Sequence, residues 1–265
     1  MEGILKEIVH IRERIGGENS CKLPLFLHSF TQSICNGEKI GFCEALNKTE
    51  NIFGHSVTNA TAQQIREMSN LKDAFLFTES LLIEADTNHR GLLTVQLIEH
   101  IHFLLMVNLV SDFKTPPGRF STQTRYTVFN GIVRYYPAFK TTDEIEERVQ
   151  ILVDQYNKEI AHIKLLDVQI DKYRKLVNLA AWFVSEFLAL HPFSDGNGRL
   201  TRILCNYLLR SEIPFNVPLQ NGGGQNELAW AIIKDRSMVG YPNVKRFITM
   251  SIYKAWKRVR DLFRR

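Results

Sequence analysis

The sequence lacks any stretch of apolar residues long enough to span a membrane. A transmembrane helix needs about 20 consecutive, predominantly apolar residues, and no such run occurs in the 265 residues. The segment 1–17 mixes charged and apolar residues like an amphipathic helix, and it lacks the apolar core and cleavage site of a secretory leader. We therefore expect no membrane span and a cytoplasmic location.

Cysteine is scarce, and no two cysteines have the Cys-x-x-Cys spacing. Four cysteines in a chain of this length do not make a disulfide scaffold, which favours a reducing compartment. Cysteine and histidine together show no spacing typical of a zinc site. Internal repeats and low-complexity tracts are absent as well. The four cysteines are Cys21, Cys35, Cys43 and Cys205.

Charge of one sign is only in slight excess. The chain has 33 Lys and Arg against 28 Asp and Glu, a net charge of +5. This balance permits an anionic ligand without requiring nucleic acid. Part of the excess lies in 254–265, where basic residues surround Trp256, Leu262 and Phe263. We interpret this segment as a last amphipathic helix with a solvated basic face. The alternative is a helix that binds a membrane surface or nucleic acid, and we expect no nucleic-acid partner.

Helical periodicity dominates the rest of the sequence. Thr94 is a candidate N-cap. Thr142 is followed after three residues by Ile145 rather than glutamate, so we expect no full capping box there. Apolar residues recur at spacings of three, four and seven and predict helices over 61–85, 94–110, 141–160, 171–191 and 197–212.

One segment departs from the helical pattern. Residues 126–134 alternate apolar and polar side chains around Asn130-Gly131, the preferred two-residue turn of a β-hairpin. Two strands alone are only marginally stable and rarely form a core sheet. The predicted fold class is therefore all-α with a small β-hairpin flap.

Polar residues interrupt an apolar helical region at 191–202, which reads HPFSDGNGRLTR. His191 ends one predicted helix, and Pro192 blocks its continuation. Gly196 and Gly198 allow the backbone to approach a ligand closely. The next helix begins there, and its free N–H groups with the positive end of its dipole form an anion site.

The charged residues of this stretch complete a candidate phosphate site. Arg199 and Arg202 are three residues apart and share a helix face, which suits more than one phosphate. Asp195 would repel phosphates unless a divalent cation lay between them, and magnesium prefers oxygen ligands. His191 is a candidate general base because its pKa lies near working pH. Each feature alone is common in structural roles, but their conjunction indicates catalysis.

The stretch HPFSDGNGRLTR resembles the active-site motif of the Fic family, HxFx(D/E)GNGRxxR, at every fixed position. PGRF at Pro117–Phe120, the hairpin ending in Tyr135-Tyr136-Pro137, and Arg202–Phe215 resemble neighbouring Fic segments. The resemblance extends over about residues 45–250 and implies an all-α Fic core with a flap. With it we divide the chain into an accessory helical segment 1–45, a Fic domain 46–250 with an inhibitory-helix region, and a basic C-terminal helix 251–265.

The resemblance implies transfer of AMP from ATP to a Ser, Thr or Tyr hydroxyl of a target protein. His191 would deprotonate the hydroxyl, Asp195 would hold Mg²⁺ on the α- and β-phosphates, and Phe193 would seat the loop. The target segment would dock on the flap at Gly131–Tyr136 by strand-like pairing. The other residues implied to contact the nucleotide are Gly196, Asn197 and Gly198, which would line the anion hole, and Arg199 and Arg202, which would hold the β- and γ-phosphates.

The sequence departs from relatives that carry an N-terminal inhibitory helix with the pattern (S/T)xxxE(G/N), whose glutamate pairs with the second motif arginine. The best local match is Thr49–Gly54, where Phe53 stands at the glutamate position. We interpret this as loss of the clamp on Arg202, which would leave an enzyme that is constitutively active or inhibited differently. A shifted register that uses Glu50, or an ordinary packing role for Phe53, is the alternative.

The nucleotide base is specified less well. Relatives often have a tyrosine near the position of Leu228. A leucine there keeps the apolar wall of the base pocket but has no ring to stack on the base. Asn226 is a candidate contact with the base or ribose. A Fic transferase that uses UMP, phosphocholine or phosphate is therefore an alternative, as is removal of AMP by the same site. A non-catalytic nucleotide-binding module is a further alternative, against which His191 argues because such a module needs no base. Relatives are often dimers, so a homodimer is left open.

Overall fold

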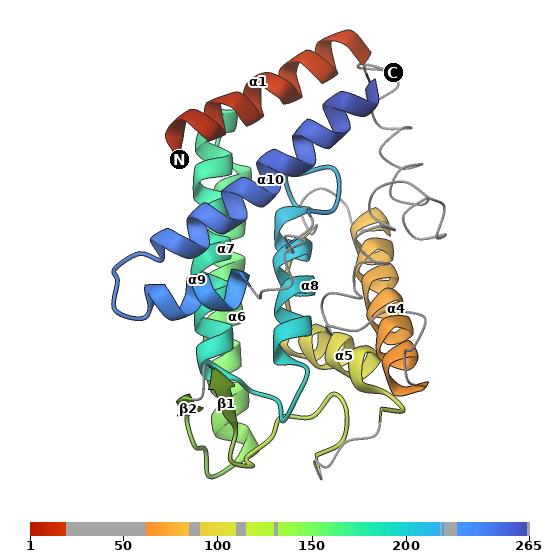
Figure 1. The fold of residues 1–265 in the computed structure, drawn as a ribbon, viewed down its shortest axis with the longest axis vertical. Helices are drawn as coiled ribbons and strands as arrows, with labels where there is room; N and C mark the ends of the chain where they lie inside the picture. The colour runs from red at the N-terminus through yellow and green to blue at the C-terminus, as the bar shows by residue number, and fades with distance from the viewer. Residues whose placement is uncertain are drawn as a thin grey trace. The chain divides into compact units, whose positions relative to one another are not determined.

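The computed structural model describes residues 1–19, 62–84, 91–109, 115–129, 132–217, 219 and 227–263. These residues form helices and a single two-stranded antiparallel hairpin (Figure 1), so the prediction of an all-α fold with a small β-hairpin is confirmed. Within these described residues, each helix is either too short or too polar to cross a membrane. Phe53 and the rest of the proposed inhibitory motif lie outside the described residues.

The chain forms two compact units, each assembled from separate stretches of sequence. The terminal unit consists of Met1–Ala60, Ile163–Ala181 and Leu209–Arg265, and the central unit consists of Thr61–His162 and Trp182–Leu208. The motif at 191–202 therefore belongs to the central unit.

In the terminal unit, α1 (Glu2–Asn19) packs along α10 (Pro242–Phe263), which also contacts α9 (Glu227–Asp235) (Figure 1). α10 begins within reach of a carboxylate, because Asp235 Oδ1 accepts from Asn243 N at 3.0 Å and its Oδ2 accepts from Val244 N at 2.8 Å. A negative charge is stabilised at a helix N-terminus, so Asp235 fixes where α10 starts. The apolar faces of these helices supply the buried residues Leu5, Ile8, Ile248, Ile252 and Trp256.

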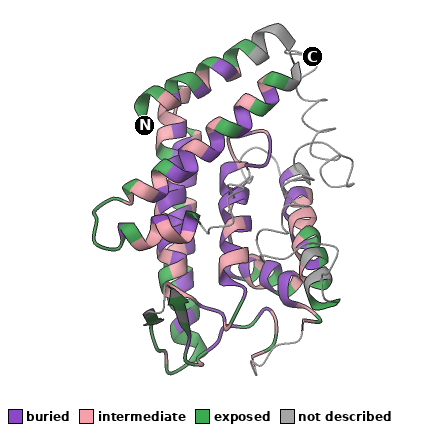
Figure 2. Ribbon diagram, viewed as in Figure 1, coloured by how far each residue is buried: buried purple, intermediate pink, exposed green. Residues whose placement is uncertain are grey.

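The central unit contains the helices that carry the motif. The helices of this unit are α4 (Ala62–Glu84), α5 (Val95–Met106), α6 (Thr142–Lys164) up to residue 162, α7 (Gln169–Leu190) from Trp182 on, and α8 (Asn197–Leu209) up to Leu208. Most of α8 is buried (Figure 2). Asn70 joins α4 to the end of α5, since its Nδ2 donates to the carbonyls of Leu105 and Val107 at 3.2 and 2.8 Å. The carbonyls at the end of α5, which have no partner within the helix, are thereby satisfied.

The cap of α5 is the residue predicted from the sequence, and the cap of α6 is one residue earlier than predicted. Thr94 caps α5 as predicted, because its side chain accepts from Leu97 N at 3.0 Å. For α6 the cap is Thr141 rather than Thr142: Thr141 Oγ1 accepts from Glu144 N at 3.3 Å. Glu144 Oε2 in turn accepts from Lys140 N at 2.8 Å. In a full capping box this carboxylate would accept from the N–H of the cap residue Thr141, whereas it accepts from Lys140. The structure therefore moves the predicted cap by one residue and gives α6 no full capping box.

The hairpin pairs β1 (Tyr126–Phe129) with β2 (Ile132–Tyr135), as predicted. Its turn, Asn130-Gly131, lies outside the described residues. The directly paired residues Tyr126 and Tyr135, and likewise Val128 and Val133, point to the same face because side chains alternate along a strand. All four are exposed, so the hairpin presents an apolar face.

A buried arginine holds the base of the hairpin. Arg125 donates from Nη1 to Ser121 O at 2.7 Å and from Nη2 to Pro137 O, and its own carbonyl accepts from Tyr136 N at 3.0 Å. These bonds tie together the segments that enter and leave the hairpin. The strands therefore project from a fixed base.

Replacing Arg125 with alanine is expected to lower the free energy of unfolding by about 3 kcal/mol, because two hydrogen bonds to a charged group are lost inside the protein. Urea denaturation of the full chain measures the change. Arg119→Ala is the matched control, since this neighbouring side chain is 72% exposed and has only a 3.7 Å ion pair with Glu99. Its expected effect is under about 1 kcal/mol. Equal effects of the two variants would contradict the role given to Arg125.

Candidate active site

Helix α7 ends at a histidine in an unusual backbone conformation. His191 N donates to Phe187 O at 3.0 Å and so continues the helical pattern, but the φ of His191 is +51°. A non-glycine residue in this left-handed region costs about 1–2 kcal/mol, and Pro192 prevents the helix from continuing. The chain therefore turns sharply at the predicted base.

The loop that follows is closed by the side chain of Asn197. Its Oδ1 accepts from Phe193 N at 3.1 Å, and its Nδ2 donates to Phe193 O at 2.8 Å. Asn197 is the first residue of α8 and is almost completely buried. Both polar atoms of the Asn197 side chain are therefore used within the loop. A contact between Asn197 and the nucleotide stays a prediction, and it concerns the backbone N–H of this residue.

Phe193 anchors the loop in the core of the central unit. Its ring is fully buried, stacks on His102 with centroids 3.7 Å apart, and lies 5.0 Å from the ring of Phe120. The backbone supports the same contact, because Ser121 N donates to Pro192 O at 3.0 Å. The PGRF segment that ends at Phe120 therefore packs directly against the motif.

Asp195 directs its carboxylate to the start of α8. Oδ1 accepts from Gly196 N at 2.6 Å, and Oδ2 lies 3.4 Å from Nη2 of Arg199. The side chain is 53% exposed. Within the described ranges no group of three or more His, Cys, Asp or Glu side chains is arranged to hold a metal ion. Magnesium commonly uses one or two carboxylates and takes its other ligands from phosphates and water, so Asp195 suits a cation that arrives with a polyphosphate.

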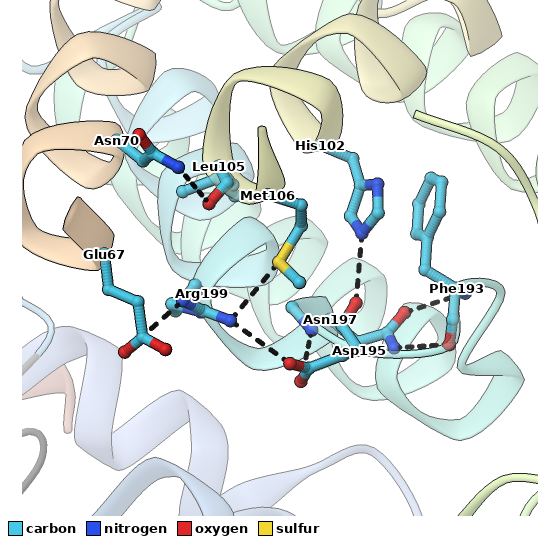
Figure 3. A network of polar contacts seen from close by, with 10 residues as sticks. Glu67, Asn70, His102, Leu105, Met106, Phe193, Asp195, Asn197 and Arg199 are labelled. Atoms are coloured by element: carbon cyan, nitrogen blue, oxygen red, sulfur yellow. Dashed lines mark hydrogen bonds and ion pairs between the residues drawn. The ribbon is translucent and has the colours of Figure 1, made fainter. Parts of the chain in front are cut away.

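The two motif arginines both fold back toward the beginning of α8. Arg202 Nη1 donates to Gly198 O at 2.9 Å, and burial lowers the pKa of this guanidinium. Arg199 lies between two carboxylates (Figure 3), with Nη2 at 3.4 Å from Asp195 Oδ2 and Nη1 at 3.8 Å from Glu67 Oε2. Glu67 comes from α4, so a helix remote in sequence supplies a negative charge to the candidate phosphate site.

The imidazole of His191 is held in its neutral form. Burial, assisted by the charge of Arg125, lowers the pKa of His191 to about 4, although the backbone of Leu188 and the charge of Asp195 oppose the shift. The ring of Tyr136 stacks on the imidazole with centroids 3.6 Å apart and planes 9° from parallel. A neutral imidazole can accept a proton, so the arrangement is compatible with general-base chemistry.

A second buried histidine, His102, lies behind the loop. Burial lowers the pKa of His102 to about 4, although its hydrogen bond with the backbone of Asp195 raises it. The sequence alone does not distinguish this residue from an ordinary core histidine. Its one signal in the sequence is its position on the apolar stripe of α5 beside Ile98, Ile101 and Leu105, all of which are buried.

Asn226 and Leu228 are the residues outside the motif that were predicted to lie near the nucleotide. Asn226 lies outside the described residues, and so does Gly131, which belongs to the predicted flap. Leu228 is buried in α9. Leu228 does not line the cavity of about 520 Å³ between α9 and α10, whose lining residues are Glu227, Trp230, Ala231, Lys234, Asn243, Arg246, Phe247, Met250 and Lys254.

Residues 92–209 match the Fic/DOC family. The chain is 37% identical over 113 residues to the ribonucleoside-diphosphate reductase small chain of Ostreid herpesvirus 1 (isolate France), a match that covers 42% of this chain and 18% of that protein. It is 38% identical over 82 residues to a Fido domain-containing protein of Dictyostelium discoideum, covering 31% of this chain and 51% of that protein. The matches thus span about half or less of these relatives.

Solved structures with the same fold include a Fic family protein from Desulfovibrio desulfuricans G20, with a TM-score of 0.61, 18% identity, and coverage of 99% of this chain and 74% of that one. A Fic domain containing signaling protein from Bacteroides thetaiotaomicron VPI-5482 has a TM-score of 0.59, 17% identity, and coverage of 96% and 92%. Fic-1 from C. elegans has a TM-score of 0.64, 17% identity, and coverage of 98% and 72%. At these identities the likeness concerns the fold.

Proposed function

Because residues 92–209 match the Fic/DOC family, we propose that this chain is a Fic-type transferase that moves AMP from ATP onto a Ser, Thr or Tyr hydroxyl of a target protein. The observation that carries the proposal is the neutral imidazole of His191. It lies at the beginning of the loop that also carries Asp195 and leads into the start of α8. A protein that only binds a nucleotide needs no such base.

In the proposed reaction the hydroxyl oxygen of the target attacks the α-phosphorus of ATP. A new P–O bond forms, the bond from the α-phosphorus to the bridging oxygen breaks, and pyrophosphate leaves. The imidazole of His191 takes the hydroxyl proton. Its depressed pKa rises when negative phosphate groups are nearby, because opposite charge favours the protonated form. The base would therefore be neutral before the nucleotide binds and stronger when it is needed.

The polyphosphate would occupy the beginning of α8. Backbone N–H groups there lack partners within the helix, and Arg199 and Arg202 would neutralise the β- and γ-phosphates. Mg²⁺, when bound by Asp195, would compensate charge on the α- and β-phosphates. The target polypeptide would lie on the hairpin, whose exposed apolar face is suited to a protein partner.

Labelled ATP tests the proposal directly. The full chain is incubated with cell lysate, magnesium and ATP labelled either at the α- or at the γ-phosphate. We expect protein-bound label from the α-labelled nucleotide that the His191→Ala chain does not produce, and equal label from the γ-labelled nucleotide with both chains, because kinases of the lysate transfer the γ-phosphate in either case. Extra γ-label with the unaltered chain would indicate phosphate transfer, and transfer from UTP or CDP-choline but not ATP would indicate another donor. No transfer from any donor, by a protein that binds Mg–ATP in calorimetry, would contradict a transferase function.

The kcat/KM of transfer is expected to change little between about pH 8 and 5, because it reports the protonation of His191 in the chain without nucleotide. Only the neutral imidazole accepts a proton, and with a pKa of about 4 it is about 90% neutral at pH 5, whereas an ordinary histidine would be about 3% neutral. Below pH 4 the kcat/KM should fall about tenfold per unit. The pH profile of kcat/KM reports the base of the free enzyme, and an acid limb centred near pH 6.5 would be inconsistent with this assignment.

Replacing Glu67 with glutamine is expected to tighten binding of Mg–ATP about three- to tenfold. The carboxylate lies 3.8 Å from Arg199 and competes with phosphate for the same guanidinium, while its ion pair at this distance is weak. Calorimetric titration with a non-hydrolysable ATP analogue measures the change. Glu99→Gln, which removes an ion pair of similar length at the protein surface, is the control and should leave affinity unchanged. Weaker binding by Glu67→Gln would indicate that this glutamate orients Arg199 instead.

A further inference from the structure

A histidine from α5 is hydrogen-bonded to two backbone segments that meet at the candidate active site. His102 is only 2% exposed. Its Nδ1 accepts from Gly118 N at 2.9 Å, and its Nε2 lies 3.0 Å from the carbonyl oxygen of Asp195 (Figure 3 shows the latter bond). Gly118 belongs to the PGRF segment and Asp195 to the motif, so one imidazole connects both.

These partners determine where the proton of His102 resides. A backbone N–H can only donate, so Nδ1 must be unprotonated to accept from Gly118. A carbonyl oxygen can only accept, so Nε2 must carry the hydrogen that is donated to Asp195. The neutral tautomer with hydrogen on Nε2 satisfies both bonds, whereas the other tautomer would place two donors together and two acceptors together.

Both backbone segments approach α5 as closely as glycine allows. A Cβ atom on Gly118 would lie 3.0 Å from Glu99 O and from Phe103 Cβ. A Cβ atom on Gly196, the residue after Asp195, would lie 3.3 Å from His102 Nε2. Both glycines have positive φ angles, +78° and +74°. The histidine therefore occupies a closely fitted position rather than a loose gap.

The peptide group between Asp195 and Gly196 is fixed from both sides. Its carbonyl oxygen accepts from His102, and its N–H donates to Oδ1 of Asp195 at 2.6 Å. The orientation of this peptide thus determines the direction in which the Asp195 carboxylate leaves the loop. Errors of about 1 Å in the position of a functional group can reduce rates by a factor of 10².

We propose that His102 is a positioning residue for the transfer reaction, which fixes the Asp195–Gly196 peptide and thereby aims the Asp195 carboxylate at the cation that accompanies the nucleotide. The effect on catalysis rests on the proposed function. The donor bond to Asp195 is the part that matters for catalysis, and the acceptor bond to Gly118 holds the ring in place.

Two amide variants separate these bonds. Asn places an acceptor where Nδ1 lies, and Gln places a donor where Nε2 lies, so His102→Asn keeps the bond to Gly118 and His102→Gln keeps the bond to Asp195. Both remove the ring that stacks on Phe193, so they lose similar packing. We expect His102→Gln to keep kcat within about tenfold, and the half-activating Mg²⁺ concentration within about twofold, of the unaltered chain. We expect His102→Asn to lower kcat about a hundredfold and to raise the Mg²⁺ requirement about tenfold, with little change in KM for the target. Equal losses in the two variants would overturn the proposal, since a role in packing alone predicts them.

An independent measurement does not require activity. Long-range ¹H–¹⁵N correlation spectra of the full chain should identify His102 as the neutral tautomer with hydrogen on Nε2, and hydrogen on Nδ1 would overturn the proposal even if neither variant folded. If the unaltered chain transfers no nucleotide to protein, the proposed function fails. The inference is then judged by calorimetry with Mg²⁺ and a non-hydrolysable ATP analogue, where His102→Asn must bind more weakly than His102→Gln.

Discussion

Replacing His191 with alanine is expected to reduce the rate of AMP transfer by a factor of about 10²–10⁴, the usual contribution of a general base. Binding of Mg–ATP should change less than about twofold, because the phosphate-binding groups belong to the start of α8 and not to the histidine. Single-turnover transfer with α-labelled ATP measures the rate, and calorimetry with a non-hydrolysable analogue measures the affinity.

His162→Ala is the matched control for this experiment. His162 also belongs to the central unit but is exposed on α6, so its removal should leave both rate and affinity unchanged. A variant of His191 that retains more than about a tenth of the rate would show that another group accepts the proton. Loss of nucleotide binding together with the rate would instead indicate that the loop had collapsed.

Adding a single methyl group at Gly196 is expected to lower the free energy of unfolding by about 2–4 kcal/mol and to abolish measurable transfer. The new Cβ would lie 2.8 Å from Met106 Sδ and 3.3 Å from His102 Nε2, and overpacking of this kind typically costs about 1–3 kcal/mol. The positive φ of +74° adds about 1 kcal/mol for a non-glycine residue. Chemical denaturation and transfer assays of Gly196→Ala test both parts.

Gly198→Ala provides the comparison, since Gly198 is a helical glycine in the same motif. A Cβ atom there would meet only Arg202 Nη1, at an ordinary contact distance of 3.5 Å. Alanine also forms helix more readily than glycine. The stability of Gly198→Ala should therefore equal or exceed that of the unaltered chain. If both variants were equally stable, the close approach of α5 to Gly196 would not hold in solution.

The motif itself could be predicted from sequence because its parts are close together in the chain. Pro192, the two glycines and the first turn of α8 act within a dozen residues, so local rules place the bend and the helix start. The cap of α6 was misplaced by one residue even though its signals are local, because two threonines adjoin and only the second was tested. The domain division at residues 45 and 250 stays a prediction.

The groups that hold the motif in place could not be predicted in this way. His102 is separated from its partner Asp195 by 93 residues, and Glu67 is farther still from Arg199. A single sequence does not state which helices become neighbours, so a histidine on an apolar stripe reads as ordinary core. The engagement of the Asn197 side chain within the loop was also missed, since the pattern GNG suggests ligand binding and local clamping equally well.

The contact between Tyr136 and His191 links the orientation of the imidazole to the base of the hairpin. Tyr136 immediately follows β2, and its ring covers one face of the imidazole. The backbone N–H of Tyr136 donates to the carbonyl of Arg125, so this ring belongs to the part of the hairpin that Arg125 holds. In the proposed reaction, a target polypeptide that bound along the strands would therefore leave the imidazole in its orientation, and the proton acceptor would be aligned before the target arrived.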